Sequence, residues 1–145
     1  MKPETIAIHA GNHIDDASKA VIQPIVLSTT FERAEDGSFP GGHIYSRSSN
    51  PNRALLENVL AKLEGGDDAA AFSSGNAAGM SVFQSLAPGT HLIAPDDMYH
   101  GLRNQLKKLF DGILKFDFID VNNIEEVDRH LMPATGLIWL ETPSN

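Results

Sequence analysis

The sequence predicts an α/β fold with a mostly parallel sheet and helices on both faces, preceded by an extended N-terminal arm. From residue 51 onward, short apolar runs alternate with stretches whose apolar residues recur at the spacing of a helix. Before residue 51, glycines and prolines interrupt the chain, and no amphipathic helix of useful length is visible. Strands that alternate with helices need right-handed crossovers, which build a parallel sheet covered on both sides.

Residues 1–50 are predicted to form the arm. Apolar patches such as 21–22 and 25–27 occur in it, but without the periodicity of an element that buries its own core. Such a segment needs another surface to cover its apolar side chains. We therefore expect the arm to pack on a neighbouring subunit.

Residues 51–145 are predicted to form the first part of a large domain that starts with a helix. Asn50 can cap this helix, Pro51 suits its first position, and Gly65 and Gly66 end it. One face of the helix carries Leu56, Val59, Leu60 and Leu63. The elements expected next are a strand at 69–72, a turn at 73–76, a helix at 77–86, a strand at 91–94, a helix at 102–110, a strand at 114–119, a helix at 124–131 and a strand at 136–140.

The last predicted strand ends five residues before Asn145. Open α/β sheets bind their ligands at the edge where such strands end, and natural domains seldom stop there. We expect the chain to be a fragment or one piece of a nicked protein. The alternative is that the fold closes with this strand.

The composition excludes several classes of protein. The net charge is −8 and the 11 Lys and Arg residues are scattered, so no surface for nucleic acid or for an anionic membrane is expected. The sequence has no cysteine, which excludes disulfides and thiolate metal sites and suits a reducing compartment. With neither a signal peptide nor a membrane span visible, we expect a cytoplasmic protein.

The histidines do not predict a metal site. His9 and His13 stand four residues apart, but Gly11 between them disfavours a helix, and no third ligand is evident. Surface or half-buried positions are expected for the other four, His43, His91, His100 and His130.

A phosphate site is suggested at Ser74, Gly75 and Asn76. A glycine at a strand-to-helix junction lets backbone N–H groups approach a phosphate, and the positive end of the helix favours an anion. The alternative is a turn that serves packing alone. The sequence contains no G-x-G-x-x-G dinucleotide motif, no P-loop and no G-x-S-x-G nucleophile motif.

Three further clusters carry polar or aromatic groups that suit a ligand. Tyr45 and Arg47, just before the first helix, combine a phenolic donor with a forked cation that matches phosphate oxygens. Tyr99, after a predicted strand, can stack on a flat aromatic ligand. The alternatives are a solvated Arg47, a half-buried Tyr45 and a core Tyr99. The fourth cluster is 141–145, at the end of the last strand.

Taken together, the four clusters resemble the pyridoxal-phosphate (PLP) enzymes of Cys/Met metabolism. The matching strings are 45–47 with 50–51, 74–78, 94–96 followed by Tyr99, and 141–145, in the order and approximate spacing of that family. Arm residues 8–11, 24–25 and 28–31 are similar to its N-terminal region. The resemblance spans almost the whole chain. It implies the large domain of an aspartate-aminotransferase-like (fold type I) PLP enzyme, assembled as a tetramer of active-site dimers.

The resemblance also implies roles for individual residues. Ser74 and the amides of Gly75 and Asn76 are expected to hold the PLP phosphate. Tyr99 is expected to stack on the pyridine ring and to face the substrate, as the catalytic residue of this segment. By the same resemblance, Tyr45 and Arg47 reach the phosphate in the neighbouring subunit, and Asn145 lies near the 3′ oxygen of PLP.

The implied activity is PLP-dependent γ-replacement or γ-elimination in sulfur amino acid metabolism, of the cystathionine γ-synthase type. It needs a Schiff-base lysine and an acidic partner for the pyridinium nitrogen, which in the family come from segments beyond Asn145. The lysines present, Lys2, Lys19, Lys62, Lys107, Lys108 and Lys115, lie in the arm, on helices or at the start of a strand. The site is therefore expected to need the remainder of the chain, including a C-terminal domain.

Three departures from the family pattern bear on the subgroup. Asn76 stands where many relatives carry Met, and His100 precedes Gly101 where Gly commonly follows the tyrosine. The chain also lacks the cysteine that is a hallmark of some γ-lyases, which disfavours methionine γ-lyase. The partner expected is a small amino-acid substrate. The alternative function is a truncated, non-catalytic binding module.

Overall fold

The computed structural model describes residues 2–143 and divides into two compact units, one through Ala71 and one from Phe72 onward. None of the helices in the described residues is long and apolar enough to cross a membrane.

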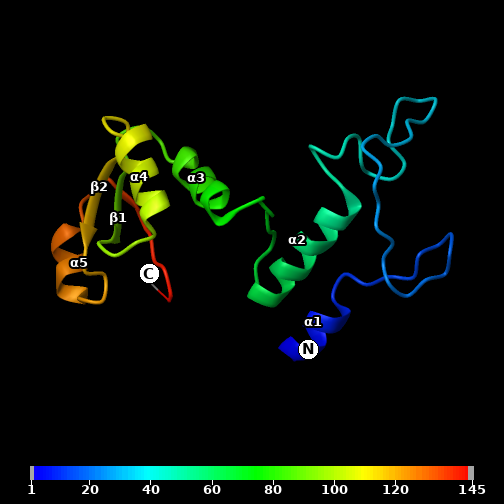
Figure 1. The fold of residues 1–145 in the computed structure, drawn as a ribbon, viewed down its shortest axis with the longest axis horizontal. Coiled ribbons are helices and arrows are strands. Elements are labelled where there is room, and N and C mark those ends of the chain that lie inside the picture. Colours follow the sequence, from blue (N-terminus) through cyan, green and yellow to red (C-terminus); the bar gives the residue numbers. More distant parts are fainter. Residues whose placement is uncertain (1, 144–145) are drawn as a thin grey trace. The chain divides into compact units, whose positions relative to one another are not determined.

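The first unit consists of two helices joined by a long irregular segment (Figure 1). Helix α1 (Pro3–His9) is a short element that the sequence pattern did not predict, with Pro3 and the acidic Glu4 in its first turn. It packs on helix α2 (Pro51–Glu64), and within the connecting segment Thr30 and Tyr45 form an isolated antiparallel bridge.

Helix α2 begins and ends where the sequence predicts. The side chain of Asn50 accepts a hydrogen bond from the N–H of Asn52, Pro51 is the first helical residue, and Gly65 ends the helix at φ 68°. The predicted apolar face is only partly covered, because Leu56, Leu60 and Leu63 are 50%, 40% and 36% exposed.

Replacing Asn50 with Ala is expected to lower the free energy of unfolding by about 1 kcal/mol, because a capping acceptor is lost. The Asn50 amide also donates to Ser46 Oγ at 3.3 Å, so the cap ties the helix to the segment before it. Asn58→Ala, at an exposed position of the same helix, is the matched control and should cost less. Urea denaturation of both variants tests this, and equal losses would contradict the capping role.

The predicted strand at 69–72 is wrong. The structure has no strand there, and the N–H groups of Ala69 and Ala71 donate instead to the side chains of Asp68 (2.8 Å) and Glu57 (2.9 Å). A run of apolar residues becomes a strand only where a neighbouring strand takes up its backbone hydrogen bonds. Here, side chains accept the hydrogen bonds from the N–H groups of Ala69 and Ala71.

The second unit has the predicted alternation of helices and strands. Its elements are α3 (Gly75–Ser85), β1 (His91–Pro95), α4 (His100–Leu109), β2 (Lys115–Ile119), α5 (Ile124–His130) and β3 (Thr135–Ile138). Each lies within a few residues of its predicted position. The confirmed elements are those with strong local signals, such as the Ser74 cap of α3 and the Asn123 cap of α5.

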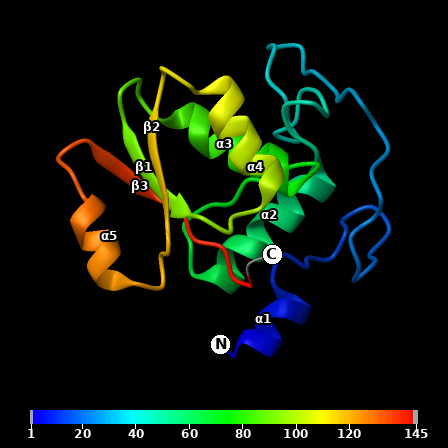
Figure 2. The ribbon, with the colours of Figure 1, turned by 60° about the vertical axis from the view of Figure 1, so that its left-hand side comes forward.

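The three strands form a parallel sheet in the order β2-β1-β3. The chain therefore passes from β1 through α4 to β2 on one side. It then passes through α5 to β3, which lies on the other side of β1. When two crossover connections have the same handedness but move in opposite directions across a sheet, their helices lie on opposite faces of it. Figure 2 shows this arrangement, with α3 and α4 on one side of the strands and α5 on the other. The predicted parallel sheet with helices on both faces is confirmed.

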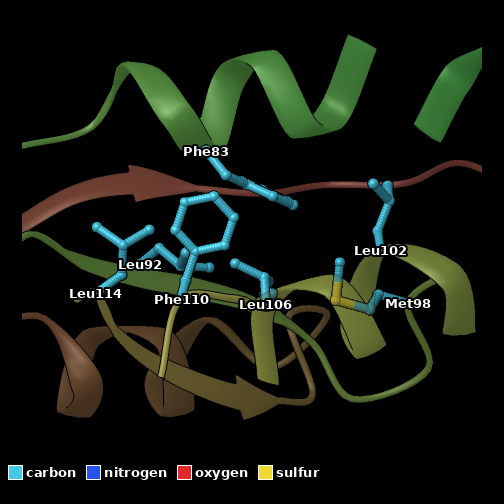
Figure 3. Close-up of a cluster of buried hydrophobic side chains, with 8 residues drawn as sticks. Phe83, Leu92, Met98, Leu102, Leu106, Phe110 and Leu114 are labelled. Carbon is cyan, nitrogen blue, oxygen red and sulfur yellow. The ribbon is translucent and has the colours of Figure 1, made fainter. Parts of the chain in front are cut away.

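The core lies between the sheet and the α3–α4 layer (Figure 3). Phe83 of α3 is fully buried and meets Phe110 edge-on, with 6.2 Å between ring centroids. The other buried members are Leu92, Ala94, Met98, Leu102, Leu106 and Leu114. This packing fixes α3 and α4 against the strand ends, where the candidate site lies.

His91 is fully buried, whereas a surface or half-buried position was expected. Its Nδ1 lies 2.7 Å from Thr135 Oγ1 on β3, and its Nε2 lies 3.3 Å from Asp117 Oδ2 on β2, a close approach without hydrogen-bond alignment. The ring thus contacts both strands that flank β1. A polar side chain is tolerated in this layer because its neighbours supply polar partners.

Candidate functional site

A hollow of about 480 Å³ opens beside the carboxyl ends of β1 and β3. It is lined by Ser74, Gly75, Asn76, Tyr99, Leu102 and Trp139. β1 has β2 on one side and β3 on the other. The order in which successive strands are added to the sheet therefore reverses at this point. Ligands of open α/β sheets bind at such a reversal, outside the carboxyl ends of the strands.

The N-terminus of α3 supplies hydrogen-bond donors to this hollow. Ser74, with φ −161° and ψ 157°, is the cap, and its Oγ accepts from the N–H of Ala77 at 3.1 Å. Gly75 and Asn76 are the first two helical residues, so their N–H groups have no acceptor within the helix. These groups lie at the positive end of an 11-residue helix, which favours an anion.

The space beside Gly75 is open. A Cβ added at Gly75 would meet no atom within 4 Å. The side chain of Asn76 faces Gly101, since a Cβ there would lie 3.1 Å from its Nδ2 and 3.2 Å from its Oδ1. That oxygen is buried and has no hydrogen-bond partner among the described residues. A ligand entering the hollow thus lies beside N–H groups that have no acceptor within the helix, and a buried amide oxygen without a partner lies behind them.

Tyr99 brings an aromatic ring to the same hollow. It is the N-cap residue of α4, and its side chain is partly exposed. The ring lies against Gly101, where a Cβ would come within 2.5 Å of Tyr99 Cε1, so glycine is needed at this position. On its other side, the ring centroid lies 4.8 Å from that of His100. The tyrosine is therefore neither a core residue nor free in solvent.

Trp139 and Glu141 complete the site from the end of β3. The Trp139 N–H donates to Ile93 O at 2.8 Å, which fixes the backbone after the strand. The indole Nε1 donates to Glu141 Oε1 at 2.9 Å, and the backbone N–H of Tyr99 donates to Glu141 Oε2 at 2.8 Å. Sequence reasoning placed Glu141 at a strand end but gave it no role, and it missed Leu102 and Trp139 as lining residues. The one available signal was a carboxylate directly after an apolar strand.

Four of the predicted site residues, Ser74, Gly75, Asn76 and Tyr99, meet in this hollow. The other three predicted ligand contacts are Tyr45, Arg47 and Asn145. Tyr45 and Arg47 belong to the first unit, both are exposed, and the Arg47 guanidinium lies 5.4 Å from the centre of the Tyr45 ring. Asn145 lies outside the described residues.

The site offers an anion and a flat ring a common place to bind, and it holds no cluster of metal ligands. Across residues 2–143, no group of three or more His, Cys, Asp or Glu side chains is placed to hold a metal ion. The chemistry available is hydrogen bonding from backbone amides, stacking on an aromatic ring, and one carboxylate that accepts two donors. These groups can bind and orient a ligand.

Comparison with known proteins identifies relatives of this chain. A family model described as "Cys/Met metabolism PLP-dependent enzyme" matches residues 4–145. The chain is 41% identical over 145 residues to a cystathionine gamma-synthase of Mycobacterium tuberculosis, a match that covers 99% of the chain and 37% of that protein. It is 38% identical over 143 residues to the cystathionine gamma-lyase of Homo sapiens, covering 97% of the chain and 35% of that protein.

Solved structures agree with these matches. The crystal structure of metB from Corynebacterium glutamicum superposes with a TM-score of 0.93 at 35% identity, covering 100% of the chain and 38% of that structure. Cystathionine gamma-lyase from yeast gives a TM-score of 0.89 at 38% identity, covering 100% and 37%. The chain thus spans a little more than a third of the length of these relatives. The similarity confirms the predicted fold class and the resemblance noted from the motifs.

Proposed function

Because the chain belongs to the Cys/Met metabolism PLP-dependent enzyme family, we propose that the protein binds PLP and catalyses γ-replacement or γ-elimination on amino acids of sulfur metabolism, in the manner of cystathionine γ-synthase. One observation carries the proposal. The free N–H groups of Gly75 and Asn76 and the ring of Tyr99 line the same hollow. PLP combines an anionic phosphate with a flat aromatic ring, and the site has a partner for each.

Each of these residues has a defined task in the proposed site. The N–H groups of Gly75 and Asn76 bind the phosphate, Ser74 holds the helix end that presents them, and Tyr99 lies along the pyridine ring. When bound, PLP supplies an electron sink for the substrate. The residues of this chain fix the position of PLP, and such fixed positioning lowers the entropic barrier of the reaction.

Other parts of the assembly are needed to complete the site. No lysine lines the hollow among the described residues, so we expect the PLP-linking lysine from a segment beyond Asn145. We propose that Tyr45 and Arg47 contact the phosphate in a neighbouring subunit of a homo-oligomer. Their exposure supports this, because an exposed phenol and guanidinium remain free to bind an anion.

Assays on the intact natural protein that carries this chain test the proposal. The visible absorption of added PLP is expected to shift on binding. With cysteine and an O-acylhomoserine, we expect cystathionine to form, because this is the synthase reaction. Release of 2-oxobutanoate from cystathionine, without synthesis, would identify a lyase instead. A protein that binds no PLP would contradict the proposal and leave the non-catalytic binding module.

Arg47→Ala in the intact protein is expected to weaken PLP binding about tenfold, because a hydrogen bond between charged groups is lost. Arg33→Ala is the matched control. Its guanidinium is also exposed and lies 5.9 Å from the centre of the Phe39 ring, so the same kind of contact is removed without the proposed phosphate contact. PLP titration measures both. If Arg47→Ala left both PLP affinity and oligomeric state unchanged, the cross-subunit role would be wrong.

A further inference from the structure

Glu141 joins two segments of the candidate site by hydrogen bonds at both of its side-chain oxygens. Its Oε2 accepts from the Tyr99 N–H before α4, and its Oε1 accepts from the Trp139 indole after β3. We propose that Glu141 is a positioning residue, which fixes Tyr99 for ring stacking in the PLP site. The inference rests on the proposed function. It adds a residue that acts through Tyr99 and does not itself touch the ligand.

The N-terminus of α4 receives no capping hydrogen bond from the side chain of its own N-cap residue, Tyr99. It occupies the N-cap position of α4, where Ser, Thr, Asp or Asn usually supplies an acceptor, and its side chain makes no capping hydrogen bond. The Glu141 carboxylate brings a negative charge to this end of α4 from 42 positions further along the chain. A carboxylate close to the positive end of a helix is stabilising, and its hydrogen bond to a backbone N–H is charge-assisted.

The backbone contact also sets the place of the ring. Tyr99 Cε1 lies so close to Gly101 that a Cβ there would clash, and His100 flanks the ring on another side. The ring thus has close neighbours on two sides, and a shift of the Tyr99 backbone would move it relative to them. Glu141 holds that backbone to the end of β3, which itself hydrogen-bonds β1 through the Trp139 N–H. A stacking group held by fixed neighbours loses less entropy on binding its ligand.

The carboxylate suits this task better than an amide of the same size. Two N–H donors face its two oxygens, and both are satisfied. A glutamine at this position has one carbonyl oxygen and one NH₂ group, so one of the two contacts would join donor to donor. We therefore expect Glu141→Ala to disturb the position of Tyr99 most, and Glu141→Gln to disturb it less, each compared with wild type.

The test titrates the apo form of the intact natural protein with PLP and records the visible circular dichroism of the bound cofactor. Glu141→Ala is expected to bind PLP about tenfold more weakly and to show a reduced dichroic band, because the ring environment becomes less ordered. Glu141→Gln should lie between it and the wild type. Glu125→Gln, which removes the same charge from an exposed position on α5, should behave as wild type.

A double-mutant cycle separates positioning from a structural role. If Glu141 acts through the tyrosine ring, Glu141→Gln should weaken PLP binding in the wild type but not further in Tyr99→Ala, where no ring remains to be placed. Losses that add in the double variant would overturn the inference, and so would a Glu141→Gln variant with unchanged affinity and dichroism. A wild type that binds no PLP would overturn the proposed function and, with it, this inference.

Discussion

Phe83→Ala is expected to lower the free energy of unfolding by about 3–5 kcal/mol, because it leaves a cavity in the centre of the second unit. The Phe83 side chain is fully buried in the layer between α3 and the sheet (Figure 3). Its ring centroid lies 5.2 Å from that of Trp139 and 6.2 Å from that of Phe110. The substitution removes both aromatic contacts along with the buried area.

The neighbouring residue on α3 provides a matched control for this prediction. Val82 is 38% exposed, so Val82→Ala removes little buried surface and improves helix propensity, and a change below about 1 kcal/mol is expected. Urea denaturation of the apo protein measures both variants against wild type. Similar losses for the two variants, or a loss below about 1 kcal/mol for Phe83→Ala, would show that this cluster does not hold the unit together.

The elements that could be predicted from sequence are those whose signals are local. Asn50 and Pro51 mark the start of α2, and Ser74 marks the start of α3, because caps act on the residues that follow directly. The short apolar runs of β1 and β2 each lie between two helices in the sequence. The helices on both sides therefore limit where each strand can begin and end. A parallel sheet then follows from the alternation itself.

The errors concern features that depend on distant partners. Residues 69–72 have the composition of a strand, but the N–H groups of Ala69 and Ala71 donate to side chains rather than to a neighbouring strand. His91 has a residue type common at the surface, yet Thr135 and Asp117 make its burial possible. Asp68 is adjacent to Ala69, but Glu57, Thr135 and Asp117 come from 14 or more positions away, so the local sequence does not reveal these contacts.

The candidate site divides in the same way. Ser74, Gly75 and Asn76 are consecutive, and the motif that contains them was visible before the fold. The Glu141 contact to Tyr99 joins residues 42 positions apart and arises only when β3 pairs with β1. Motifs thus predicted groups that could touch a ligand, whereas the contact by which Glu141 is proposed to position Tyr99 became visible only in the tertiary structure.

Gly75→Pro is expected to weaken PLP binding by about tenfold to a hundredfold, because proline removes one N–H donor to the phosphate. The substitution suits the helix. Gly75 is the first residue of α3, where proline is favoured, and Ser74 before it is already extended at ψ 157°. A Cβ added at this position would meet no atom within 4 Å. The variant therefore removes a ligand contact with little expected effect on folding.

Two controls separate loss of the donor from other effects of the change. Gly75→Ala adds a Cβ but keeps the N–H, so its PLP affinity should stay close to that of wild type. Pyridoxal, which lacks the phosphate, should lose much less affinity for Gly75→Pro than PLP does. If proline weakened both ligands equally, the N–H of Gly75 would not bind the phosphate, and the anion would have to be held by other donors. A selective loss for PLP would instead assign the anion to the N-terminus of α3, where free N–H groups and the positive end of the helix coincide.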